Sequence, residues 1–115
     1  MDRLAVAVAP DGPGRFVVTL AGELDLAAAD GFWAELEPLI EPAGMVVLDG
    51  TELSFLDSSG LRVLLLANTR ARELGARLRL VAPHRAVRRT LELTGANDLV
   101  TTFPTVDDAL VVEAD

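Results

Sequence analysis

The pattern of apolar positions near the start of the chain predicts two strands. Residues 3–9 form a short, mostly apolar run that ends at the Gly/Pro-rich turn signal PDGPG. Residues 15–22 then place Phe16, Val18 and Leu20 on one face of an extended chain. Two such runs joined by a tight turn are typical of a β-hairpin.

The apolar period lengthens after Asp25 to the spacing of a helix. One predicted helix face collects the apolar residues Leu26, Ala29, Trp33, Leu36 and Ile40. Asp25 suits the N-cap position, because its carboxylate can accept hydrogen bonds from the free amides of a first helical turn. Pro38 predicts the end or a kink of this helix, since proline lacks the backbone N–H that a helix interior requires.

The remaining pattern predicts strands that alternate with helices. Residues 45–49, MVVLD, form the continuous apolar run expected of a strand buried on both faces. Two further strands are predicted, at residues 77–81 and 99–102, and the first of these is expected to be half-exposed because Arg alternates with Leu. Helices are predicted at residues 59–74, 84–94 and 105–113, and Gly75 is expected to end the first of them. The order ββαβαβαβα predicts a single α/β domain over residues 1–115, with a central mixed, mostly parallel sheet and packed helices.

Composition narrows the class of protein. Half of the 115 residues are apolar, which is enough for one hydrophobic core, and cysteine is absent. No signal peptide is recognised at the N-terminus, and no apolar run approaches the roughly 20 residues of a membrane-spanning helix. We therefore expect a soluble, cytoplasmic protein with no membrane partner.

The formal net charge of −8 is concentrated in the first half of the chain. Residues 1–57 hold eleven acidic residues and two arginines, whereas residues 58–115 hold seven acidic residues and eight arginines. Nucleic-acid binding requires a clustered positive surface, so no nucleic-acid partner is expected. The basic string HRAVRR, residues 84–89, is interpreted as a solvated helix face whose arginines pair with acids elsewhere.

Two polar segments follow predicted strands. GELD, residues 22–25, follows the second strand, and DSSG, residues 57–60, ends the loop after the third. Ligand and partner sites gather beyond the carboxyl ends of parallel strands. The carboxylates of Glu23 and Asp25 are therefore expected to lie close to Ser58 and Ser59.

The two serines have a structural and a functional interpretation. Ser and Asp are favoured N-caps, so one of Asp57, Ser58 and Ser59 is expected to cap the following helix, and the residues alone favour capping. The functional interpretation is phosphorylation, because a serine in a first helical turn lies where amides and the helix dipole favour added negative charge. Nearby carboxylates would repel that charge at an interface with a partner.

Catalysis and cofactor binding lack their usual residues. The only histidine, His84, is expected to be solvated or to cap the third predicted helix, so neither serine has an evident base. DSSG does not match the nucleophile pattern G-x-S-x-G, and no phosphate-binding glycine motif is present. We predict that the protein is not an enzyme and holds no cofactor and no metal.

Three segments together resemble a known family. LAGELD, VVLDGTELSFLDSSGLRVLL and VAPHRAVRRTLELTG are similar to the landmarks of STAS domains, specifically bacterial anti-sigma factor antagonists. The likeness runs from about Phe16 to Leu110 with no large insertion. It departs at Gly50, which follows the final Asp of the strand and is expected to relax the backbone of the loop that leads to the serines.

The resemblance implies a STAS fold and a partner switch. In that family an unphosphorylated antagonist binds an anti-sigma factor, often a serine kinase, and so frees the sigma factor. The kinase phosphorylates the antagonist and breaks the complex, and a PP2C-type phosphatase restores it. The resemblance implies that Ser59 is the phosphoacceptor, with Ser58 as the alternative, and that the partner-binding residues are Glu23, Asp25, Asp57, Ser58, Gly60 and Leu61.

Two further hypotheses remain open from the sequence. The chain could be a STAS docking module of another complex, such as a transporter accessory subunit or a stress-signalling assembly, which phosphorylation does not regulate. It could also bind or weakly hydrolyse nucleotides, although nothing in the sequence cradles phosphates. An intact, phosphorylatable DSSG favours the anti-sigma factor antagonist over both.

Overall fold

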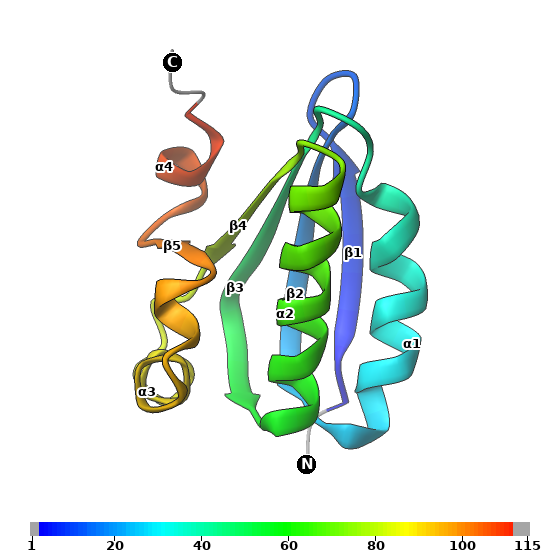
Figure 1. The fold of residues 1–115 in the computed structure, drawn as a ribbon. Coiled ribbons are helices and arrows are strands. Elements are labelled where there is room, and N and C mark those ends of the chain that lie inside the picture. The colour runs from blue at the N-terminus through cyan, green and yellow to red at the C-terminus, as the bar shows by residue number, and fades with distance from the viewer. Residues whose placement is uncertain (1–2, 112–115) are drawn as a thin grey trace.

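The computed structural model describes residues 3–111, within which five strands form one sheet. The strands lie in the sheet in the order in which they occur along the chain (Figure 1). They are β1 (Ala5–Pro10), β2 (Arg15–Leu24), β3 (Met45–Leu56), β4 (Arg77–Val81) and β5 (Thr101–Phe103). β1 is antiparallel to β2, and every other neighbouring pair is parallel. The predicted mixed, mostly parallel sheet is confirmed.

The helices cover the two faces of the sheet unequally. They are α1 (Leu26–Leu36), α2 (Ser58–Glu73), α3 (Arg85–Thr94) and α4 (Val106–Leu110), with short 3-10 turns at Glu37–Leu39 and Ala96–Asp98. Residues of α1, α2 and α3 share the larger core with one face of β3, including Val46 and Leu48. Ala109 of α4 packs with Val47 from the opposite face. The predicted element order is confirmed, and Figure 1 shows α1 and α2 side by side along the sheet.

The ends of the helices follow the expected signals. The Asp25 carboxylate accepts a hydrogen bond from the Ala28 amide at 3.1 Å, which confirms the predicted N-cap. Gly75 follows α2 with a φ of +64°, a conformation that favours glycine. The His84 side chain accepts from the Ala86 amide at 3.3 Å and caps α3, as predicted. The last helix is shorter than expected, and residues 112–113 of its predicted span lie outside the described residues.

The buried face of α1 differs from the predicted one. Ala29 and Leu36 are buried as expected, but Phe32 replaces Leu26, which is 76% exposed. Leu26 is the first residue of α1, immediately after the cap, where the helix has only just left the end of β2. The prediction of a helix was correct, but the sheet ends before Leu26 and therefore does not cover this residue.

β3 continues well beyond the apolar run that predicted it. Residues 50–56, expected to be a loop, extend the strand to Leu56 and pair with the end of β2. Gly50 belongs to this strand, and a Cβ added there would lie 2.6 Å from the Val81 carbonyl oxygen, so the glycine permits close packing. The polar sequence TELS hid this extension, because its side chains are mostly exposed and its pairing with β2 contains register shifts.

Arg79 shows why β4 is not half-exposed. Its side chain is 7% exposed and donates to the carbonyl oxygens of Ala109, at 2.7 Å, and Val111. The guanidinium also lies over the ring of Phe103, 5.2 Å from its centroid. A buried cation thus holds the carboxyl end of α4, an arrangement that a pattern of alternating Arg and Leu does not reveal.

The arginines of α3 are exposed, but they do not pair as expected. Arg85, Arg88 and Arg89 form no ion pair with any carboxylate of residues 3–111. Glu92 is the only acid on α3, and most other acids lie on elements from the first half of the chain. The prediction of a solvated face is confirmed, and the prediction of paired arginines is wrong.

Candidate functional site

The ends of β2 and β3 bring the GELD and DSSG segments together. Glu23 pairs with Phe55 and Leu24 with Leu56 in the parallel register. The backbone continues this contact, because the Asp57 amide donates to the Leu24 carbonyl oxygen at 3.3 Å. The sequence-based expectation that the two segments are neighbours is confirmed.

Asp57 fixes the beginnings of two helices with one carboxylate. Its Oδ1 accepts hydrogen bonds from the amides of Ser59, at 2.9 Å, and Gly60, at 3.0 Å, in the first turn of α2. Its Oδ2 accepts from the Leu26 amide of α1 at 3.2 Å. Free amides and the positive end of a helix dipole both favour an anion at this position. Asp57 is therefore the N-cap of α2, and of the three residues expected to supply the cap neither serine does so.

Gly60 allows α2 to begin directly on the ends of two strands. A Cβ at this position would lie 2.5 Å from the Leu24 carbonyl oxygen and 2.8 Å from Cδ1 of Leu56. Real Cβ atoms do not approach other heavy atoms so closely, so a larger residue would displace the helix or the strands. The glycine sets the height of the first turn above the sheet.

The two serines differ in exposure although they are adjacent. Ser58, the first residue of α2, is exposed, whereas Ser59 is half-buried. Neither hydroxyl forms a hydrogen bond with another of the described residues. Because the caps are supplied by Asp57, the hydroxyl of Ser58 is free to face solvent at the start of the helix.

Carboxylates surround the serines from two sides. Glu23, near the end of β2, is half-buried, and Asp25 is half-buried with one oxygen committed to capping α1. Asp57 binds backbone amides at the start of both α1 and α2. Negative charge added to a serine would enter a field of helix amides that attract it and carboxylates that repel it.

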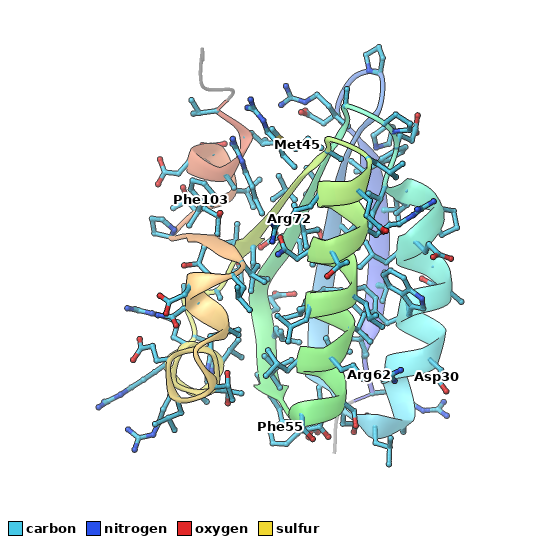
Figure 2. The ribbon with its side chains drawn as sticks, in the orientation of Figure 1. Asp30, Met45, Phe55, Arg62, Arg72 and Phe103 are labelled. Carbon is cyan, nitrogen blue, oxygen red and sulfur yellow. The ribbon has the colours of Figure 1, made fainter. Side chains whose placement is uncertain are left out.

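Two exposed apolar side chains that were not among the predicted site residues lie at the same end of the sheet. Leu26 at the start of α1 is 76% exposed, and Phe55 near the end of β3 is 43% exposed. Figure 2 shows Phe55 at the end of the sheet where α2 begins. The signal was available in part, since the first residue after an N-cap often projects beyond the sheet that the helix covers.

Not every predicted site residue reaches the surface. Gly60 is buried and Leu61 is only 8% exposed, because both face the strands beneath α2. The outer side of α2 instead carries Ser58, Arg62 and Leu66, which follow one another at helical spacing and are all exposed. Gly60 and Leu61 position the site, and other residues form its surface.

The described part of the chain contains neither a metal-binding cluster nor a membrane span. No three side chains among the His, Asp and Glu residues of positions 3–111 gather in a way that could hold a metal ion. No helix within the same residues is long and apolar enough to cross a bilayer.

The family profile of STAS domains matches residues 6–109. The chain belongs to the STAS domain family. The match includes all five strands except for the first residue of β1, and it contains the whole serine site. It confirms the resemblance drawn from the LAGELD and DSSG segments.

Solved structures of several STAS domains are similar to this one. An anti-sigma factor antagonist from Mycobacterium paratuberculosis is 28% identical, with a TM-score of 0.82 and coverage of 94% of this chain and 92% of that one. The unphosphorylated anti-sigma factor antagonist SpoIIAA is 23% identical, with a TM-score of 0.78 and coverage of 95% and 100%. The phosphorylated form of SpoIIAA, from Bacillus, is 23% identical and has a TM-score of 0.71. The match covers 92% of this chain and 96% of that one.

The STAS fold also occurs within a larger membrane protein. The murine anion transporter Slc26a9 is 22% identical, with a TM-score of 0.74, and the match covers 89% of this chain but 18% of the transporter. This likeness shows a shared fold, and the surrounding transporter has no counterpart in the 115 residues of this STAS domain.

Proposed function

We propose that this STAS domain is an anti-sigma factor antagonist controlled by phosphorylation of the DSSG motif. In the unphosphorylated state it binds an anti-sigma factor that is itself a serine kinase, and the sigma factor is released. The observation that carries the proposal is the exposed position of Ser58 as the first residue of α2, next to Asp57, whose carboxylate binds the amides of both Leu26 and Ser59. The antagonists among the similar structures support it.

Exposure favours Ser58 over Ser59 as the phosphoacceptor. A kinase must bring the γ-phosphoryl group of ATP in line with the serine oxygen, and the half-buried Ser59 offers less room for that approach. In the transfer, the Oγ–P bond forms, the bond to ADP breaks, and the hydroxyl proton passes to a base of the kinase. The order of preference drawn from the resemblance is thereby reversed, with Ser59 as the alternative.

The electrostatics of the site suit a switch that spares the fold. A phosphoserine adds about −1.5 to −2 charges. At the first turn of α2 the helix amides favour this charge, so the domain itself stays folded. A partner that covers Leu26, Phe55 and Ser58 would have to bury the phosphate beside Glu23, Asp25 and Asp57, at a much larger cost.

The proposed role implies binding partners and a cytoplasmic location, and it requires no catalytic activity of the protein itself. The partners are the anti-sigma factor kinase and a PP2C-type phosphatase, in the cytoplasm where sigma factors act. We assign the protein no catalytic function, because His84, its single histidine, is engaged in capping α3.

A second role is supported by one comparison. Since the Slc26a9 transporter contains a similar domain, the same surface could dock into another assembly without phosphorylation. The two roles differ in what they require of Ser58: a switch requires its hydroxyl, whereas a docking surface requires only its small size.

The test measures binding to serine-kinase anti-sigma factors encoded in the same genome, with and without a substitution at each serine. Ser58→Asp should weaken the complex at least about tenfold, since a charge is forced into the interface. Ser58→Ala should bind like the wild type and take up no phosphate from the kinase and ATP. Ser59→Asp and Ser59→Ala are the matched controls one residue away.

Peptide mapping of residues 55–66 then locates the phosphate on protein isolated from its own cells. Phosphate on Ser58 supports the switch, and phosphate on Ser59 restores the order implied by the resemblance. A protein that stays unmodified in growth and stress, and binds no such kinase, would favour the docking role.

A further inference from the structure

Arg62 is exposed on the same side of α2 as Ser58. The two residues are separated by four positions, which places their side chains about one turn apart on a helix. Side chains of a helix lean toward its N-terminus, so the long Arg62 side chain extends over the turn that begins with Ser58. A phosphate on Ser58 would lie within its reach.

The charge of Arg62 is not engaged by another described residue. Arg62 forms no ion pair with any carboxylate of residues 3–111, in contrast to Arg70 on the same helix, which lies 3.8 Å from Glu73. Figure 2 shows Arg62 on the side of α2 that faces α1, the helix that carries Asp30. A phosphate dianion carries more charge than Asp30 and would compete for the guanidinium.

Charged groups of both signs lie on the elements around Ser58. α3, whose Thr90 hydroxyl donates to the Leu56 carbonyl oxygen at 3.5 Å, carries Arg85, Arg88, Arg89 and Glu92. β2 contributes Glu23, α1 contributes Asp25 and Asp30, and Asp57 caps α2 itself. Arg3 precedes β1 at the same end of the sheet, and β2 separates β1 from the strand that leads into α2. Arg62 is the cation that lies on the same helix as Ser58, one turn away.

We propose that Arg62 is the phosphate-binding residue of the switched-off state and holds the phosphorylated Ser58 side chain along α2. This inference rests on the proposed phosphorylation and adds how the modified site is organised. The guanidinium forms a charge-assisted hydrogen bond with the phosphate oxygens and keeps the phosphate fully ionised near neutral pH. The same contact removes Arg62 from the surface that the partner would meet, so phosphorylation both adds an anion and withdraws a cation.

The test places phosphoserine at position 58 during synthesis of the protein, so that no kinase is needed. The second ionisation of the phosphate is followed by phosphorus NMR at about 0.15 M salt, where distant surface charges are screened. In the otherwise wild-type chain the acid dissociation constant should be about 1.4- to 2.3-fold larger than in Arg62→Gln, as expected for an exposed pair at this spacing. Arg62→Lys should recover part of the difference.

Two matched variants remove a charge elsewhere. Arg70→Gln removes an arginine from the same helix about 18 Å from Ser58 along the helix axis, and Arg3→Gln removes the cation before β1. Both should leave the dissociation constant unchanged. Equal constants with and without Arg62, or equal effects of all three substitutions, would overturn the inference.

Failure of the proposed function would look different. If the protein with phosphoserine at position 58 still bound the anti-sigma factor, the switch would be wrong whatever Arg62 does. The phosphoserine could instead block binding equally in the presence and absence of Arg62, with equal acid dissociation constants of the phosphate in the two proteins. The switch would then stand, and only the role of Arg62 would be wrong.

Discussion

Asp57 and Arg79 are charged side chains that bind free backbone groups at opposite ends of helices, but they differ in how exposed their surroundings are. Asp57 accepts amides at the beginnings of α1 and α2, where an anion is favoured, and Arg79 donates to carbonyl oxygens at the end of α4, where a cation is favoured. Arg79 is buried and is covered by the groups that it binds. Asp57 binds only backbone and leaves its neighbour Ser58 exposed.

The two regions differ in whether a polar side chain is exposed, as Ser58 is, or buried, as Arg79 is. At the α4 end the charged side chain itself completes the packing, together with Phe103 and a hydrogen bond of 3.1 Å from Arg15 to the Leu110 carbonyl oxygen. At the α2 end the charged side chain holds the backbone, so that the next residue can change chemically without loss of structure. Substitutions in the two regions should therefore have separable effects on stability and binding.

The largest effect is expected for Gly60→Ala, which attacks the rigidity of the α2 end. The added Cβ would overlap the Leu24 carbonyl oxygen, and relief of that overlap should lower the free energy of unfolding by about 2 to 3 kcal/mol. Urea unfolding measures the change. Gly31→Ala in α1 is the matched control, because a Cβ there meets nothing within 4 Å and should stabilise the helix by about 0.5–1 kcal/mol. Similar values for both alanines would show that Gly60 is not tightly packed.

Arg79→Met should have the next largest effect and confine it to the α4 end. Loss of the charge-assisted hydrogen bonds to Ala109 and Val111 should cost about 1.5 to 3 kcal/mol of unfolding free energy, partly offset by burial of the apolar side chain. Urea unfolding gives the cost, and binding of the anti-sigma factor should be unchanged. A weakened complex with little loss of stability would contradict the separation of the two regions. Arg70→Met, at an exposed position, controls for the change in charge.

Asp57→Asn should give the smallest loss of stability and the most local one. The side chain keeps its shape but loses its charge and one of its two acceptor oxygens, which should cost about 1 kcal/mol. Hydrogen exchange of the backbone should accelerate at Leu26 or at Ser59 and Gly60, depending on which way the amide group turns. Unchanged exchange at all three amides would mean that the carboxylate does not join the two helices.

The sequence revealed those parts of the fold that local chemistry determines. The cap at Asp25, the end of α2 at Gly75 and the element order follow from the residues themselves. The meeting of GELD with DSSG was also predictable, because parallel strands bring their carboxyl ends to one edge. The family resemblance supplied the functional hypothesis, because the capping chemistry alone favoured a purely structural role for the serines.

The features that the sequence concealed depend on partners distant in the chain. β3 extends through a polar segment because β2 is there to pair with it, and Arg79 is buried because α4, 30 residues later, supplies carbonyl oxygens. Leu26 follows the helical period, yet the sheet ends before it can be covered. The choice of Asp57 over the serines as cap required the positions of two helices at once.

The match between strand order in the sheet and strand order in the chain has a consequence for handedness. Each of the connections β2-α1-β3, β3-α2-β4 and β4-α3-β5 moves one strand further in the same direction. Crossovers between parallel strands are almost always right-handed, so a steady direction of winding places α1, α2 and α3 on a single face, as their shared core shows. It also makes α1 and α2 start at the same end of the sheet, where the Asp57 carboxylate binds amides of both, whereas Figure 1 shows α3 lying across them. A protein that docks over Ser58 would therefore meet the positive ends of two helix dipoles that the winding of the chain places side by side.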